Sequence, residues 1–316
     1  MRALGLGLSL LLCGTMAKAQ EPGQAPALPT ETASGVPNAI LEFRVPSLEM
    51  VAFRGVFNLD SAGMPQHAML YPAFGLAGFV GSLVAHALII EMGKQDQRSQ
   101  AEKDADLVLD SLKPALAGFS NSSLISSAIE QSAFQDRGRV LNPGQPDNGG
   151  WVVDSAPIIW VTQDQQSLIA DTDLAIRKPG AKNPWKGRIR VISDRISGDD
   201  PLTHWLPDSG APLRLATAKL LGRTFEIGLK YAPTDPKAID ALPFQTVRYT
   251  LEGRKKVERA QVLQQGCDYH LLRTLRGDFY AVPTHKLALE EDEPVPDCPL
   301  AKPPTAEQNK PPATAT

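Results

Sequence analysis

MLYPAFGLAGFVGSLVAHALII, residues 69–90, contains no charged side chain and is long enough to cross a bilayer as a helix. Small residues recur in it at intervals of four: Ala73, Ala77, Gly81 and Ala85. On a helix, this spacing forms a ridge of small side chains that a second helix backbone can approach closely. The stretch therefore predicts an apolar helix with a helix-contact ridge, in lipid or in protein.

The composition of this predicted helix leaves its environment open. Glycine, alanine and serine contribute little to membrane insertion, and His86 opposes it. Three interpretations remain: a membrane-embedded or membrane-associated helix, a helix buried in an oligomer or partner interface, and a core helix of a soluble fold. His86 is either a ligand or proton-handling group or, as is commoner for a lone histidine among apolar residues, a satisfied core residue.

A polar stretch follows residue 90, and no proline interrupts it before Pro114. Its second half carries an amphipathic stripe at alternating steps of four and three, formed by Ala105, Leu109, Leu112, Leu116 and Phe119. Asn121 is a suitable N-cap for a further short helix. Residues 69–135 are therefore predicted to form the apolar helix, a polar stalk that continues it, and a short helix.

The N-terminus is typical of a secretory signal peptide. Arg2 precedes an apolar run, and Ala17-Lys18-Ala19 is an A-x-A cleavage site. We expect cleavage between Ala19 and Gln20, which makes the mature protein periplasmic or envelope-associated.

The cysteines agree with an exported location. A lipoprotein signal with an acylated Cys13 is disfavoured, because Leu12 stands where a small residue is expected. Cleavage leaves Cys267 and Cys298, and two cysteines in an oxidising compartment are more often paired than free. We therefore predict a disulfide between them. This prediction conflicts with a stop-transfer span at residues 69–90, which would leave the C-terminal domain in the cytoplasm.

The mature chain is mildly acidic. The whole chain has a net charge of −3, and loss of Arg2 and Lys18 with the signal moves it to −5. Interspersed charges with this balance argue against a nucleic-acid partner. Hydrophobic residues make up 42% of the chain and charged residues 21%, which is ordinary for a protein with a sizeable core.

The region after residue 150 has the patterns of an α+β domain. Apolar runs predict strands at residues 157–162, 167–176 and 187–193, and hairpins that pair 244–251 with 256–263 and 269–275 with 279–282. A helix between them has a predicted buried stripe of Leu213, Ala216, Leu220, Thr224, Ile227 and Tyr231. The predicted fold class is α+β: an antiparallel sheet with one packed helix, preceded by the long small-residue-rich apolar helix and its amphipathic continuation.

The predicted domain organisation follows these patterns along the chain. It consists of a signal peptide (1–19), a disordered spacer (20–37), a short β lead-in (38–68), the helical region (69–135), a linker (136–150), the α+β domain (151–287) and a disordered Pro/Ala/Thr-rich tail (288–316).

No catalytic motif can be found in the sequence. It contains no nucleophile elbow, phosphate-binding loop or H-E-x-x-H helix, and its histidines have no metal-ligand spacing. Asp171 and Asp173 alternate on one predicted strand face and could form a carboxylate pair, but two solvent-facing acids are the commoner arrangement. We therefore predict no catalytic residue, no cofactor and no metal.

The leading functional hypothesis is an exported cell-envelope protein without enzymatic activity. It would be anchored or oligomerised through the helix of residues 69–90, contacting itself, another envelope protein or the membrane, and would present the α+β domain as an interaction surface. One alternative is a soluble periplasmic binding or hydrolytic protein whose site matches no motif. Another is an accessory of an envelope transport or pore assembly.

Overall fold

The computed structural model of the chain describes residue 36 and residues 39–56, 100–252, 254–284 and 287–288. These residues belong to a single unit, Ala33–Thr316. The predicted signal peptide, the apolar helix of residues 69–90 and the tail beyond residue 288 lie outside the described residues.

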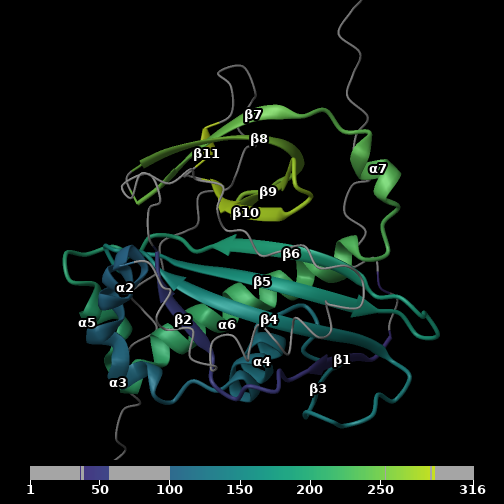
Figure 1. The fold of residues 1–316 in the computed structure, drawn as a ribbon, viewed down its shortest axis with the longest axis horizontal. Coiled ribbons are helices and arrows are strands. Elements are labelled where there is room, and N and C mark those ends of the chain that lie inside the picture. Colours follow the sequence, from purple (N-terminus) through teal and green to yellow (C-terminus); the bar gives the residue numbers. More distant parts are fainter. Residues whose placement is uncertain (1–35, 37–38, 57–99, 253, 285–286, 289–316) are drawn as a thin grey trace, which may run out of the picture. The chain divides into compact units, whose positions relative to one another are not determined.

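The described residues form a mixed α/β fold in which a large mixed sheet packs against a long helix (Figure 1). The strands are β1 (Leu41–Arg44), β2 (Ala52–Gly55), β3 (Gly138–Leu141), β4 (Trp151–Val161), β5 (Leu168–Arg177), β6 (Trp185–Ile192), β7 (Gln245–Leu251), β8 (Arg254–Gln265), β9 (Tyr269–Thr274), β10 (Phe279–Pro283) and β11 (Leu287–Ala288). Their order is β11-β7-β8-β9-β10-β6-β5-β4-β1-β3, and β2 also pairs with β4.

Along the chain, helices come before and after the central strands β4, β5 and β6 of this sheet. They are α2 (Gln100–Asp106), the 3-10 helix η3 (Leu107–Leu112), α3 (Lys113–Leu116), α4 (Asn121–Glu130), α5 (Pro201–Trp205), α6 (Pro207–Tyr231) and α7 (Pro236–Asp240). None of these helices is both long and apolar enough to span a membrane. From residue 100 to residue 116, the predicted polar stalk is a succession of short helices rather than one continuous helix.

The prediction of an antiparallel sheet is correct for its centre but not for the whole. β4, β5 and β6 pair antiparallel, as do the predicted hairpins β7–β8 and β9–β10. β1 pairs parallel with both β3 and β4, β2 pairs parallel with β4, and β10 pairs parallel with β6. An alternating pattern shows which face of a strand is buried but not which strand lies beside it, so these parallel neighbours were missed.

The long helix α6 runs across one face of β4, β5 and β6 (Figure 1). Five members of its predicted stripe are buried: Leu213, Leu220, Thr224, Ile227 and Tyr231. The four apolar residues of this set join the larger core cluster together with alternate residues of β5 and β6, including Leu174, Ile176 and Ile189. The buried side chains of the helix, spaced at its 3.6-residue period, thus pack in one core with strand side chains spaced every two residues.

A second, smaller core lies on the opposite face of the sheet. It joins Ile169 of β5 and Ile192 of β6 to Val247 and Tyr249 of β7 and Leu272 of β9. Because β7 is several strands away from β5 in the sheet order, the sheet must curl for these side chains to meet. The curl covers part of the central sheet on the side that α6 leaves open.

Candidate functional site

Two cross-strand ion pairs lie on the face of β5 and β6 opposite α6. Asp171 faces Arg190 with an Oδ2–Nη2 distance of 2.5 Å, and their side chains are 11% and 22% exposed. Asp173 accepts hydrogen bonds from Nε and Nη2 of Arg188 at 2.8 and 3.2 Å. Both pairs are directly opposite in the strand register. The two aspartates share one face, as predicted, but each pairs with an arginine rather than with the other.

The curled strands bring further ionisable groups to these pairs. The Arg190 guanidinium lies 5.0 Å from the Tyr280 ring, and the Tyr249 hydroxyl donates to Glu258 Oε2 at 3.4 Å. Burial raises the pKa of Glu258, although Arg190 and the Tyr249 hydrogen bond act against this rise. Burial likewise raises the pKa of Asp278, against the attraction of Arg188. Two acids with perturbed pKa values therefore flank a pair of arginines.

Burial lowers the pKa of Arg190, but the Asp171 carboxylate and Tyr280 more than offset it, so this pKa lies above its ordinary value. Asp171 Oδ1 and Arg190 Nε are buried and make no hydrogen bond within the described residues. We call these residues the ion-pair layer (Asp171, Asp173, Arg188, Arg190, Glu258 and Asp278): the first four form two ion pairs, and the arginines of these pairs also act electrostatically on Glu258 and Asp278. In the described part of the chain, no three His, Cys, Asp or Glu side chains are arranged to bind a metal ion.

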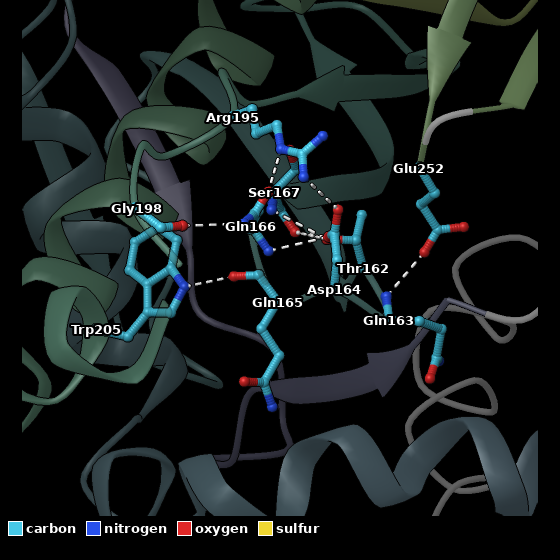
Figure 2. A network of polar contacts seen from close by, with 10 residues as sticks. All are labelled: Thr162, Gln163, Asp164, Gln165, Gln166, Ser167, Arg195, Gly198, Trp205 and Glu252. Carbon is cyan, nitrogen blue, oxygen red and sulfur yellow. Dashed lines mark hydrogen bonds and ion pairs between the residues drawn. The ribbon is translucent and has the colours of Figure 1, made fainter. Parts of the chain in front are cut away.

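The turn between β4 and β5, residues 162–167, is a second polar centre (Figure 2). Thr162 Oγ1 donates to Asp164 Oδ1 at 2.6 Å and accepts from the Ser167 backbone N–H at 3.0 Å. Asp164 Oδ1 also accepts from the Gln166 N–H at 3.1 Å. Gln165 takes a left-handed conformation, φ 56°, which an L residue adopts only when its surroundings hold it there.

This turn is bonded to segments far away in the sequence. The Gln165 carbonyl accepts from Trp205 Nε1 of α5 at 2.7 Å, and Gln165 Nε2 donates to the Val108 carbonyl of η3 at 2.8 Å. Gln163 Nε2 donates to the carbonyls of Val56 and Ala105, just after β2 and in α2. Side-chain amides of this turn thus donate hydrogen bonds to backbone carbonyls of distant short elements.

The tip of the β7–β8 hairpin also attaches to this turn. Glu252 Oε1 accepts from the Gln163 backbone N–H at 2.8 Å, and Figure 2 shows Glu252 on the side of the turn away from Trp205 and Gly198. Burial raises the pKa of Glu252, against the effect of the Gln163 hydrogen bond, and Asp164 adds to the rise. Arg195 pairs with Asp164 at 3.5 Å and also donates to Gln166. The contact fixes one end of the curl that encloses the second core.

The side of the β7–β8 hairpin that points away from the second core is basic. We call it the outer face and define it by Arg248, Thr250, Lys255, Val257 and Arg259, all of which are exposed. Cross-strand pairing sets Arg248 opposite Val257 and Thr250 opposite Lys255. The acids of this hairpin lie elsewhere, because Glu252 is bonded at the tip and Glu258 lies in the ion-pair layer.

Apolar groups accompany these basic side chains. Val257 is 64% exposed, and Leu275, one position beyond the Ala260–Thr274 pair of β8 and β9, is 66% exposed. Large apolar side chains with this exposure are few in the described chain. A face that combines cations with exposed aliphatic groups can bind a partner by charge and by apolar contact.

The predicted site residues are placed only in part. The helix-contact ridge Ala73, Ala77, Gly81 and Ala85 lies outside the described residues, as do His86 and Cys298. Cys267 is exposed in the turn after β8 and is disulfide-bonded, but its partner also lies outside the described residues, so the pairing with Cys298 stays a prediction.

Comparison with models of known protein families, with curated proteins and with solved structures found no match to this chain. The functional argument therefore rests on the sequence and on the geometry described above.

Proposed function

We propose that this chain is an exported cell-envelope protein without enzymatic activity, whose described domain binds an acidic polypeptide of another envelope component. The signal-peptide pattern supports the exported location. The observation that carries the interaction role is the outer face of β7–β8, where Arg248, Lys255 and Arg259 surround Val257.

The ion-pair layer supports a binding role over a catalytic one. Asp171 and Asp173 are each engaged by an arginine on the neighbouring strand. Carboxylates in such pairs order a sheet face and are poorly placed to exchange protons with a substrate. The cationic side chains of the outer face, by contrast, are exposed.

The chemistry of the outer face favours an acidic polypeptide with interspersed aliphatic side chains. Arginine and lysine bind carboxylates, while Val257 and Leu275 offer apolar contacts that a nucleic-acid backbone would not use. Because all these groups are exposed, the attraction is screened by salt and contributes chiefly to association rate and selectivity.

Fluorescence anisotropy with the purified mature chain tests this role. The probe is a fluorescein-labelled peptide in which glutamate alternates with valine, called the acidic probe below. We expect the double variant Lys255→Gln/Arg259→Gln to weaken probe binding by about tenfold, the loss of roughly 1.4 kcal/mol for two exposed charge contacts.

The matched control is Lys182→Gln/Lys219→Gln, which removes the same charge from exposed positions outside the hairpin. It should leave probe binding nearly unchanged. Equal weakening by both double variants, or equal binding of a single-stranded oligonucleotide to the wild type, would contradict the proposal.

The anchoring part of the proposal concerns the predicted helix of residues 69–90. Its small-residue ridge supports close contact with a second copy or with another envelope protein. Replacement of Gly81 by Leu should abolish self-association or membrane retention after a carbonate wash. If the wild-type protein is a fully soluble monomer, this part of the proposal fails. If the protein is retained in the membrane and conducts ions in planar bilayers, the result favours a pore accessory instead.

A soluble binding or hydrolytic protein is the second candidate, and one observation favours it. Glu258 and Asp278 have raised pKa values beside Arg190 and Arg188, an arrangement that also occurs at active sites. Under this candidate, Gly81→Leu should only destabilise the core by overpacking. Hydrolysis of generic ester or phosphoester substrates that is lost in Glu258→Gln would support it.

A further inference from the structure

Strands on both sides of residues 57–99 belong to the same sheet. β1 and β2 precede these residues, and both pair parallel with β4, which follows them (Figure 1). Phe43 of β1 and Phe53 of β2 are buried in the larger core, and the Phe43 ring centroid lies 4.7 Å from that of Phe225 in α6. Residues 41–55 are therefore an integral part of the sheet and core that the later chain completes.

The chain before residues 57–99 is also in close contact with the chain after them. The Gly55 N–H of β2 donates to Asp106 Oδ1 of α2 at 2.8 Å, and Arg54 Nη1 pairs with Asp106 Oδ2 at 3.4 Å. A Cβ added at Gly55 would lie 1.9 Å from the Ala105 carbonyl oxygen, so the approach of β2 to α2 requires a glycine there. The end of β2 and the end of α2 are thus held against each other.

Gln163 of the β4–β5 turn joins the same two places. Its Nε2 donates to the Val56 carbonyl at 2.6 Å and to the Ala105 carbonyl at 3.1 Å, and the Val56 N–H donates to the Val161 carbonyl at 2.8 Å. Each of the two acceptor oxygens lies within 3.1 Å of one nitrogen, so they are at most about 6 Å apart. Ala105 is five residues beyond Gln100, the first residue of α2, which is about 8 Å along a helix. The chain therefore leaves the sheet after Val56 and returns to it nearby.

This geometry bears on the membrane topology that the sequence left open. The hydrocarbon core of a bilayer is about 30 Å thick, whereas paired strands are held by hydrogen bonds of about 3 Å. A single pass at residues 69–90 would put β1 and β2 on one side of the membrane and β4 on the other. Strands that are paired in one sheet cannot be separated in this way, so the pairing is incompatible with a stop-transfer span.

The disulfide at Cys267 is an independent observation that agrees with this conclusion. Cys267 directly follows β8, which belongs to the same sheet as β1 and β4, and it is disulfide-bonded. Disulfides form and persist in oxidising compartments and are rare in the cytoplasm. The later part of the sheet is therefore expected in the compartment to which the signal peptide directs β1 and β2.

We infer that residues 41–56 and the described residues from 100 onward occupy the same exported compartment, and that residues 57–99 are an insertion attached to the domain at both ends. The chain enters and leaves any contact made by this insertion from the same side. The inference rests on the proposed function for the exported location, and it narrows the anchoring part of that proposal. The domain can be anchored through the insertion, but not as the cytoplasmic end of a single-pass protein.

Thiol labelling in intact cells tests the inference with the full chain, expressed with its signal peptide in a Gram-negative host. One variant is Glu49→Cys, which precedes the insertion, and the other is Lys182→Cys, which follows it; both positions are exposed. The reagent is a sulfonated maleimide that does not cross the inner membrane. We expect both variants to be labelled in intact cells as completely as after detergent lysis. The wild-type chain is the control for background labelling, because a disulfide-bonded cysteine does not react.

The outcomes separate this inference from the proposed function. Labelling of Glu49→Cys in intact cells, with labelling of Lys182→Cys only after lysis, would overturn the inference and leave a single-pass anchor. If both variants are labelled only after lysis, the protein is not exported, and the inference and the proposed function both fail. If both are labelled in intact cells but a carbonate wash releases the protein, the inference stands and membrane anchoring fails.

The contact between β2 and α2 has a separate test. Gly55→Ala should lower the midpoint of thermal unfolding by about 5 °C, because the added methyl group would meet the Ala105 carbonyl. Gly118→Ala is the matched control and should leave the midpoint nearly unchanged, since a Cβ there meets no atom within 4 Å. Equal midpoints for the two variants would overturn the attachment of both ends of the insertion at one place.

Discussion

At the residue scale, the clearest feature of the described structure is that its ion pairs differ widely in burial. Asp171–Arg190 is the most buried of the pairs described above, whereas Asp110–Lys113 is 56% and 72% exposed. A buried charge that loses its partner costs far more than an exposed one, because water does not replace the lost interaction.

Asp171→Ala should therefore lower the free energy of unfolding by about 3 kcal/mol, because it leaves Arg190 buried without its counter-charge. Asp110→Ala, the control, should cost about 0.5 kcal/mol or less. Urea unfolding followed by circular dichroism measures both. A cost for Asp171→Ala as small as that of the control would show that the ion-pair layer is not a stabilising part of the fold.

The Glu258 carboxyl should make the stability of the protein depend on pH. Burial raises its pKa above the ordinary value of 4.5, so the folded state favours its protonated form. Its contribution to stability is full below that ordinary value and is lost as the pH rises through the raised pKa. Glu258→Gln keeps an acceptor for the Tyr249 hydroxyl but carries no charge to bury.

The stability of Glu258→Gln relative to the wild type should therefore increase from pH 4 to pH 7. Thermal unfolding midpoints across this range measure the difference. A difference that is constant with pH would show that the Glu258 carboxyl is not disfavoured in its ionised form, which would also weaken the second functional candidate.

At the element scale, α6 is positioned by its contact with α4 as well as by the sheet. A Cβ added at Gly222 would lie 2.7 Å from the backbone carbonyl oxygen of Ala128 in α4. Because that atom belongs to a helix backbone, it cannot rotate away as a flexible side chain can.

Gly222→Ala should thus destabilise the protein by about 1–3 kcal/mol, since α4 and α6 must move apart. Gly118→Ala is the control, because no atom lies within 4 Å of a Cβ added there. Differential scanning calorimetry should show a lower midpoint for the first variant and a nearly unchanged one for the second. Equal midpoints would mean that the α4–α6 contact is looser than its geometry indicates.

The helices and strands themselves were predicted from the sequence more reliably than the pairing of one strand with another. The apolar run of residues 167–176 identified β5, and the stripe that contains Leu213 and Ile227 identified the buried side of α6. Both signals are local. The parallel pairing of β10 with β6 depends on the path of the chain between them, which no pattern within either strand records.

The contacts of the candidate site were harder to predict from the sequence, because they too join residues that are far apart in the chain. Alternation placed Asp171 and Asp173 on one face, but only the strand register reveals Arg190 and Arg188 opposite them. The glutamines of the β4–β5 turn were missed, because their partners are backbone carbonyls such as that of Val108, far away in the chain. The one local signal was the density of glutamines in TQDQQS, residues 162–167.

At the scale of the whole molecule, the sheet separates two roles. Its centre, between α6 and the second core, holds the described residues together. Its β7–β8 hairpin is attached at the tip through the bond between Glu252 and Gln163, and the residues of its outer face are exposed. In the proposed account, the predicted helix of residues 69–90 anchors or oligomerises the protein, and this hairpin binds the partner.

The most direct measurement is zero-length carbodiimide cross-linking of the acidic probe to the mature chain, mapped by mass spectrometry. The reagent joins a probe carboxylate to a lysine amine that it already contacts. The account predicts that cross-links concentrate at Lys255 of the outer face and are lost when salt is raised to 1 M, where the screening length falls to about 3 Å. Cross-links spread evenly over Lys182, Lys219 and Lys255, or concentrated away from the hairpin, would contradict it.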